Sequence, residues 1–200
     1  MPWTARTLLP TLAAALALAG CASSSGTETP AGKSAPARHG PTIGGAVVDP
    51  AETIAANVAK APNLTTLVRA LTAAGLVETL AGPGPYTLLA PTNDAFGRLQ
   101  PGTVDTLLKP ENKPSLVKLL NYHIVAGRIT TRDLRARIAA GGGSATLTSL
   151  EGDPLTVSLT SDVLTLTDVN GNRSYIQTGD VPQSNGLIQV VNGMLIPDLG

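Results

Sequence analysis

Apolar side chains follow a helical repeat in the first half of the chain. Between residues 54 and 76 they recur every three or four positions, which is the spacing of a helix with one buried face. Proline and glycine disfavour the interior of a helix, and Pro62 and Gly75 interrupt the pattern. Several short helices are therefore predicted, with buried sides formed by Ile54, Val58, Ala61, Leu64, Leu67, Val68, Leu71 and Leu76.

A strand and further short helices are predicted in the middle of the chain. Residues 86–90 (YTLLA) are mostly apolar at successive positions, as in a strand that is buried on both faces. After this strand, Thr92 or Asn93 can cap a short helix that carries Phe96 into the core. Three more helices are predicted: one with Pro101 in its first turn that reaches Leu108, one over residues 111–122, and one that a Thr130 and Asp133 capping box opens and that reaches Ile138.

The second half changes to the repeat of β-strands. Short segments rich in β-branched residues are separated by turns that contain glycine and asparagine. The pair Asn170-Gly171 predicts a primed two-residue turn, and Asn185-Gly186 predicts a turn with positive φ values. Helices concentrated in the N-terminal half and mostly antiparallel strands after them indicate an α+β fold. The predicted strands lie within residues 145–150, 155–159, 163–169, 174–178 and 187–191.

The first residues have the pattern of an export signal that ends at a cysteine. Arg6 precedes a run of leucine and alanine over residues 8–19, which is of signal-peptide length and short for a membrane span. The run ends in Leu-Ala-Gly-Cys, which resembles a bacterial lipobox, and the resemblance implies a lipid on Cys21 after cleavage. Cys21 is the only cysteine, so an intramolecular disulfide is excluded. Residues 1–20 are therefore predicted to be a lipoprotein signal peptide.

The segment after the signal has the composition of a tether. Residues 21–45 are rich in serine, alanine, glycine and proline, and Ile43 is their one large aliphatic side chain. Such a segment buries too little surface to offset its chain entropy, so it is predicted to be a disordered linker. One folded domain is predicted over residues 46–200.

The net charge of the chain argues against one class of partner, and its aromatic content predicts the kind of core. Fourteen basic and fourteen acidic side chains leave no net charge, so binding to nucleic acid is not expected. The chain has one Phe, one Trp and three Tyr, which predicts an aliphatic core.

Three stretches resemble the signature blocks of the fasciclin (FAS1) domain, in the family's order. They are YTLLAPTNDAF at 86–96, NYHIVAG at 121–127 and GDVPQSNGLIQVVNGMLIP at 179–197, and the resemblance covers essentially all of residues 46–198. It implies a wedge of β-strands packed with several helices, in secreted or surface-anchored proteins associated with adhesion.

The resemblance also singles out candidate partner-binding residues. In animal members of the family the tyrosine and histidine of the second block, here Tyr122 and His123, have been linked to recognition of cell receptors. Asp180 and Val181 of the third block are the other candidates. On the residues alone, His123 follows a helix end, where an imidazole can donate to carbonyls that have no helical partner. For Asp180, acceptance of backbone N–H groups is at least as good an interpretation as partner contact.

These observations lead to a prediction of function. No triad or metal-ligand spacing is recognisable, so no catalytic residue, metal or cofactor is predicted, and the protein is expected not to be an enzyme. The leading hypothesis is an exported, lipid-anchored binding or adhesion module of the cell envelope, at the outer membrane or on a periplasmic or extracellular face. Its partners are the membrane, through Cys21, and an unidentified protein or polysaccharide. The alternative is a carrier of a small ligand such as haem, with Tyr122 or His123 as the iron ligand.

Overall fold

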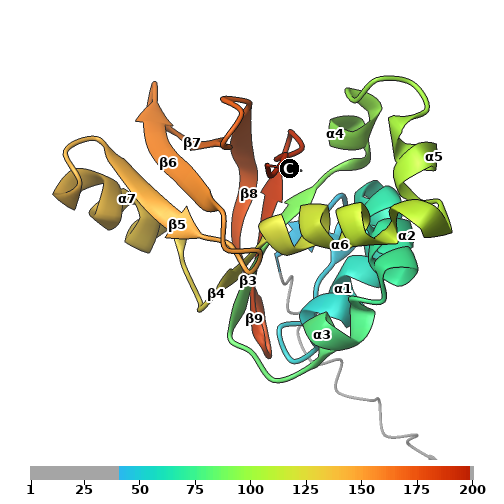
Figure 1. Cartoon of the computed structure of the whole chain (residues 1–200). Helices are drawn as coiled ribbons and strands as arrows, with labels where there is room; N and C mark the ends of the chain where they lie inside the picture. Colours follow the sequence, from blue (N-terminus) through green and yellow to red (C-terminus); the bar gives the residue numbers. More distant parts are fainter. Residues whose placement is uncertain (1–40, 199–200) are drawn as a thin grey trace, which may run out of the picture. The chain divides into compact units, whose positions relative to one another are not determined.

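The computed structural model describes residues 41–198 (Figure 1). The predicted signal peptide, Cys21 and most of the predicted linker lie outside this range. Within it, the helices are α1 (Ile54–Lys60), α2 (Thr65–Ala74), α3 (Val77–Ala81), α4 (Asn93–Gly97), α5 (Thr103–Leu107), α6 (Lys113–Tyr122) and α7 (Thr131–Ala140), with the 3₁₀ turns η1 (Pro62–Leu64) and η2 (Pro110–Asn112). The strands are β1 (Thr42–Ile43), β2 (Ala46–Val47), β3 (Tyr86–Pro91), β4 (Ile124–Ala126), β5 (Ser144–Thr148), β6 (Pro154–Thr160), β7 (Val163–Thr167), β8 (Arg173–Gln183) and β9 (Gly186–Val191).

Seven of these strands form one mixed sheet in the order β4-β3-β9-β8-β7-β6-β5. Neighbouring strands run antiparallel except β3 and β9, which run parallel. The two outer strands approach each other at one end, where Leu150 N donates to Ile124 O over 2.7 Å and Val125 bridges to Ser149. The α+β prediction, with its mostly antiparallel sheet, is confirmed.

The central strands divide the interior into two cores. Successive side chains of a strand point to opposite faces, so Leu88 and Ala90 of β3 enter one core while Leu89 between them enters the other. The first core packs β3 and β9 against α1, α2, α3 and α6, and the second packs β5, β6 and β7 against α7. Figure 1 shows α7 beside β5 and β6, with the other helices gathered on the opposite side of β3 and β9.

Local capping predictions are confirmed, but two helices begin later than predicted: α5 at Thr103, and α6 at Lys113 after the 3₁₀ turn η2 and not at residue 111. The Thr92 side chain caps α4, and Thr130 and Asp133 form the reciprocal capping box of α7. Pro101 was predicted to lie in the first turn of the helix that follows α4, and this prediction is wrong. The chain takes a left-handed turn at Gly102 (φ 82°), and α5 begins after it, at Thr103.

The primed turn lies in a different hairpin from the predicted one. Ser161 and Asp162, with φ values of 50° and 67°, connect the paired residues Thr160 and Val163. This is the geometry that matches the twist of an antiparallel pair, here made without glycine. Residues 168–172, in contrast, form a wider loop, because the Asp168 carboxylate accepts from the backbone N–H groups of residues 170 and 172.

The predicted positive φ values at Asn185-Gly186 are also wrong. Neither residue is among those with positive φ. Gly186 is required for another reason: a Cβ there would lie 1.9 Å from the backbone oxygen of Tyr86 on the neighbouring parallel strand. The Asn185 side chain accepts from Ile54 N and donates to the carbonyls of Leu80 and Gly82, so it ties α1 and α3 to the start of β9.

The packed region begins before the predicted boundary at residue 46. β1 and β2 form a small hairpin, and Ile43 is 1% exposed within the first core. The glycines at 44 and 45 take the positive φ values that this turn needs. Ile43 therefore belongs to the folded domain and not to the linker.

Replacing Ile43 with alanine tests this boundary. We expect Ile43→Ala to lower the free energy of unfolding by about 2–5 kcal/mol, because it leaves a cavity in the core. The matched control in the same hairpin is Val47→Ala, at a side chain that is 57% exposed, and it should change stability by less than about 0.5 kcal/mol. Urea denaturation of the full chain measures both. Equal effects would place Ile43 outside the core.

Candidate functional site

Tyr122 and His123 lie in the interior of the protein. Tyr122 is the last residue of α6, His123 is its C-cap, and β4 begins directly afterwards. Both side chains are 0% exposed. The block therefore forms a buried corner between a helix and a strand.

The His123 ring links α6 to the C-terminal segment. Its backbone N–H bonds to Leu120 O, which leaves the carbonyl of Leu119 without the usual helical partner. Nδ1 lies 2.9 Å from that carbonyl, and Leu195 N lies 3.1 Å from Nε2. A carbonyl can only accept and a backbone N–H can only donate, so the ring is the neutral tautomer with its proton on Nδ1. The predicted donation to a helix-end carbonyl is confirmed.

Burial and this bonding pattern both oppose a charge on His123. Burial lowers the pKa of the imidazole from 6.5 to about 4, although the hydrogen bond to Leu119 and the nearby Asp168 act in the opposite direction. A second ring proton would also point at the N–H of Leu195 and break that hydrogen bond. Since Nε2 is already occupied, it can ligate iron only if the C-terminal segment moves away, and the arrangement does not fit a haem ligand.

Tyr122 points its hydroxyl at a neighbouring strand. The phenol donates to Pro154 O over 2.8 Å, which connects α6 to β6. Burial is the main cause that raises the pKa of Tyr122 to about 12. The side chain is therefore a neutral hydrogen-bond donor at any physiological pH.

Asp180 caps the start of α7 from a distant strand. It lies where the register of β8 shifts against β9 and has a φ of 58°. Its carboxylate accepts from the N–H of Thr131, the first residue of α7, over 2.7 Å, and also from the Thr131 hydroxyl and from Gln189 Nε2. A carboxylate at this position compensates free N–H groups and the positive end of the helix dipole. Val181 next to it is fully buried in the first core.

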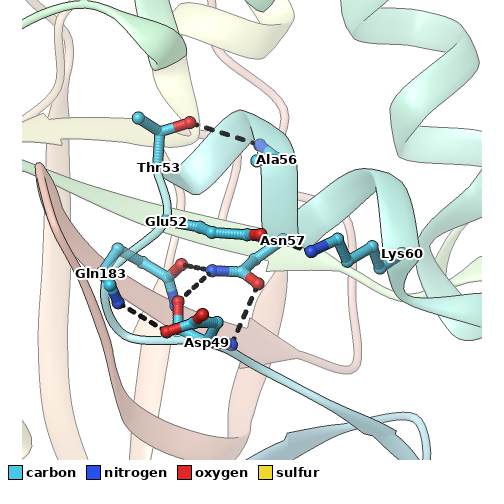
Figure 2. Close-up of polar contacts among 8 residues, drawn as sticks. Asp49, Glu52, Thr53, Ala56, Asn57, Lys60 and Gln183 are labelled. Carbon is cyan, nitrogen blue, oxygen red and sulfur yellow. Dashed lines mark hydrogen bonds and ion pairs between the residues drawn. The ribbon is translucent and has the colours of Figure 1, made fainter.

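A buried amide pair joins α1 to the end of β8 and was not predicted from the sequence. Asn57 and Gln183 are 1% and 2% exposed, and Asn57 Nδ2 donates to Gln183 Oε1. Figure 2 shows the Asn57 amide also bonded to the backbone of Asp49, and Lys60 paired with Glu52 nearby. The one available signal was a polar residue three positions after Ile54 and four before Ala61, on the buried side of α1.

Each candidate polar side chain is thus engaged inside the fold. The structure brings Tyr122 and His123 together at the end of α6 but places Asp180 and Val181 on β8, where Asp180 contacts α7 and Val181 enters the first core. Among residues 41–198, no group of three or more His, Cys, Asp or Glu side chains is placed to hold a metal ion. In the same range, no helix is long and apolar enough to cross a membrane.

Comparisons with known proteins agree on one family. Residues 62–197 match the model of the fasciclin domain. Protein sll1483 of Synechocystis sp. is 40% identical over 154 residues, which cover 77% of this chain and 78% of that protein. Immunogenic protein MPB70 of Mycobacterium bovis is 32% identical, over 78% of this chain and 73% of its own length.

Two animal proteins extend the comparison. Transforming growth factor-beta-induced protein ig-h3 of Sus scrofa is 37% identical over 66% of this chain, a stretch that is 18% of the animal protein. A solved FAS1 domain pair from the insect cell adhesion molecule Fasciclin I has a TM-score of 0.64 and 16% identity, covering 77% of this chain and 52% of that one. At this identity the likeness shows a shared fold.

Stability should depend on pH through His123. Below pH 6.5 a histidine in the unfolded chain binds a proton, whereas His123 in the folded protein does so at about pH 4. Because the unfolded state binds more protons between these values, the free energy of unfolding should fall by about 3 kcal/mol as pH drops from 7 to 4. Denaturant titrations across this range measure the change.

Two variants isolate the contribution of His123. His123→Gln should be less stable at pH 7 by about 1–3 kcal/mol, because it cannot keep both hydrogen bonds, but it should lose the histidine part of the pH dependence. His39→Gln changes the other histidine of the chain, so a dependence that comes from His123 must persist in it. An unchanged slope in His123→Gln would contradict the assignment.

Proposed function

The chain belongs to the fasciclin (FAS1) domain family, and on this basis we propose that it is a non-catalytic binding or adhesion module held at a membrane by a lipid on Cys21. The observation that supports it most is the engagement of Tyr122, His123 and Asp180 in hydrogen bonds within the fold. Their polar atoms serve the packing of the domain, so recognition falls to the exposed surface that they hold in shape. The solved FAS1 pair that shares the fold comes from a cell adhesion molecule, which agrees with this role.

The candidate partner-binding residues act indirectly in this proposal. Tyr122 and His123 fix the corner between α6 and β4, and Asp180 fixes the start of α7 against β8. Val181 packs in the first core and pairs with Ile188 of β9. Substitutions there would change affinity by moving these elements and not by removing a contact atom. The partner is a protein or polysaccharide of the matrix, of another cell or of the envelope.

The sequence pattern at the N-terminus supports the anchor. A cysteine directly after a signal-like segment and a small-residue cleavage site favours lipid attachment, and several acyl chains together hold a protein stably where one is marginal. The protein is then exported and lies at the outer membrane or on a periplasmic or extracellular face. Many copies on one surface strengthen weak contacts through avidity.

Cys21→Ser tests the anchor. We expect the wild-type chain to fractionate with membranes and to begin at an acylated Cys21, and the serine variant to appear in the soluble fraction. Mass spectrometry of the mature N-terminus and fractionation measure the two effects. An unmodified Cys21, or cleavage at another position, would exclude lipid anchoring without affecting the binding proposal.

Binding is tested separately with the lipid-free Cys21→Ser chain. It should bind isolated native envelope or matrix saturably, and binding should survive a single carboxylate change such as Asp105→Asn at an exposed position. Sedimentation with labelled protein measures this, with bovine albumin as the non-binding control. Loss of all binding in the lipid-free chain would show that retention comes from the lipid alone.

A further inference from the structure

Two adjoining hollows lie between α5, α6 and the segment that follows β9. The inner one has a volume of about 110 Å³ and the outer one about 390 Å³. Thr103, Leu107 and Ser115 line both, so the two spaces lie against each other. The inner hollow is completed by Leu99, Leu119, Met194 and Ile196.

The two parts differ in polarity. Aliphatic side chains form most of the inner wall, whereas the outer rim includes Thr106 and Asn112, with the Asn112 amide bonded to Thr106 O over 2.7 Å. Thr103 and Ser115 are half-buried and border both parts. In the described part of the chain neither hydroxyl makes a side-chain hydrogen bond, and none of the residues that line the hollows is charged.

We propose that these hollows form a binding site for a small neutral amphiphile, namely a linear alcohol with an alkyl group of about four carbons. An engineered cavity of about 150 Å³ in another protein binds benzene, so a 110 Å³ space suits a group slightly smaller than that ring. The hydroxyl of the ligand would then reach the unpaired hydroxyls of Thr103 and Ser115. A charged head group would have to lose water without gaining an opposite charge, which disfavours it.

The inner wall is held in place by the buried histidine. Leu119 and the residues on either side of Leu195, Met194 and Ile196, all line the inner hollow, and His123 bonds both Leu119 O and Leu195 N. The ring thus fixes α6 against the C-terminal segment directly behind the cavity. This makes the hollow a preformed space, which lowers the cost of ligand binding. The site is independent of the proposed adhesion function.

The methionine methyl groups provide a direct NMR probe of ligand binding in the inner hollow. The chain has two, Met1 and Met194, and Met194 lines the inner hollow. In the full chain labelled with ¹³C-methyl methionine, we expect 1-butanol to shift the Met194 methyl signal saturably, with a Kd of about 1–10 mM as befits so small a ligand. The experiment uses the unprocessed chain, in which Met1 is still present and is the internal reference. A linear, unsaturated shift, or equal shifts of both signals, would overturn the site.

Ligand and protein variants separate the two parts of the proposal. Butyrate and butylammonium should bind at least about tenfold more weakly than 1-butanol, because their charges stay unpaired. Ser115→Ala should weaken 1-butanol by about two- to tenfold through the lost hydrogen bond, and Ser115→Leu should abolish its binding by filling the space. If Ser115→Leu does not fold, the comparison of the three ligands on the wild-type chain decides. Equal affinity for charged and neutral ligands, or saturable binding to folded Ser115→Leu, contradicts the proposal.

Discussion

A neutral, fully buried imidazole is the constraint on which the rest of the structure depends. His123 is 0% exposed and has one donor and one acceptor nitrogen, each matched to a backbone group. Its Nδ1 completes the end of α6 and its Nε2 holds Leu195, 72 residues further along the chain. Its own carbonyl accepts from Leu89 N, so the same residue also continues the sheet. Through its side chain and its backbone, this one residue therefore joins a helix, the strands β3 and β4, and the C-terminal segment.

The other polar residues of the signature stretches likewise connect helices to strands through hydrogen bonds. Asp180 holds the start of α7 against β8, Tyr122 connects α6 to β6, and Asn185 ties α1 and α3 to β9. Burying such groups is favourable only when their hydrogen bonds are made, and a half-made network is costly. In this chain, the polar residues of the signature stretches thus attach two cores to one sheet. The surfaces that this framework supports are where the proposed recognition would take place.

Local features of this fold could be predicted from the sequence, and long-range ones could not. The Thr130 and Asp133 capping box and the Thr92 cap involve residues three apart, so their chemistry is visible in a short window. The primed turn was predicted at Asn170-Gly171 from composition, but it lies at Ser161 and Asp162, which carry no glycine. The loop after β7 instead takes its shape from the hydrogen bonds of the Asp168 carboxylate. For His123, donation to the helix end was predictable from its position. Acceptance from Leu195, like the Asn57 and Gln183 pair, depends on chain segments that only the tertiary fold brings together.

The protonation of His123 tests this account most directly. In ¹⁵N-labelled protein, NMR of the imidazole nitrogens should show a protonated Nδ1 and an unprotonated Nε2 at pH 7, unchanged until the pH approaches about 4. A ring that titrates near 6.5, or that carries its proton on Nε2, would contradict the view that a buried neutral histidine joins the helix to the C-terminal segment.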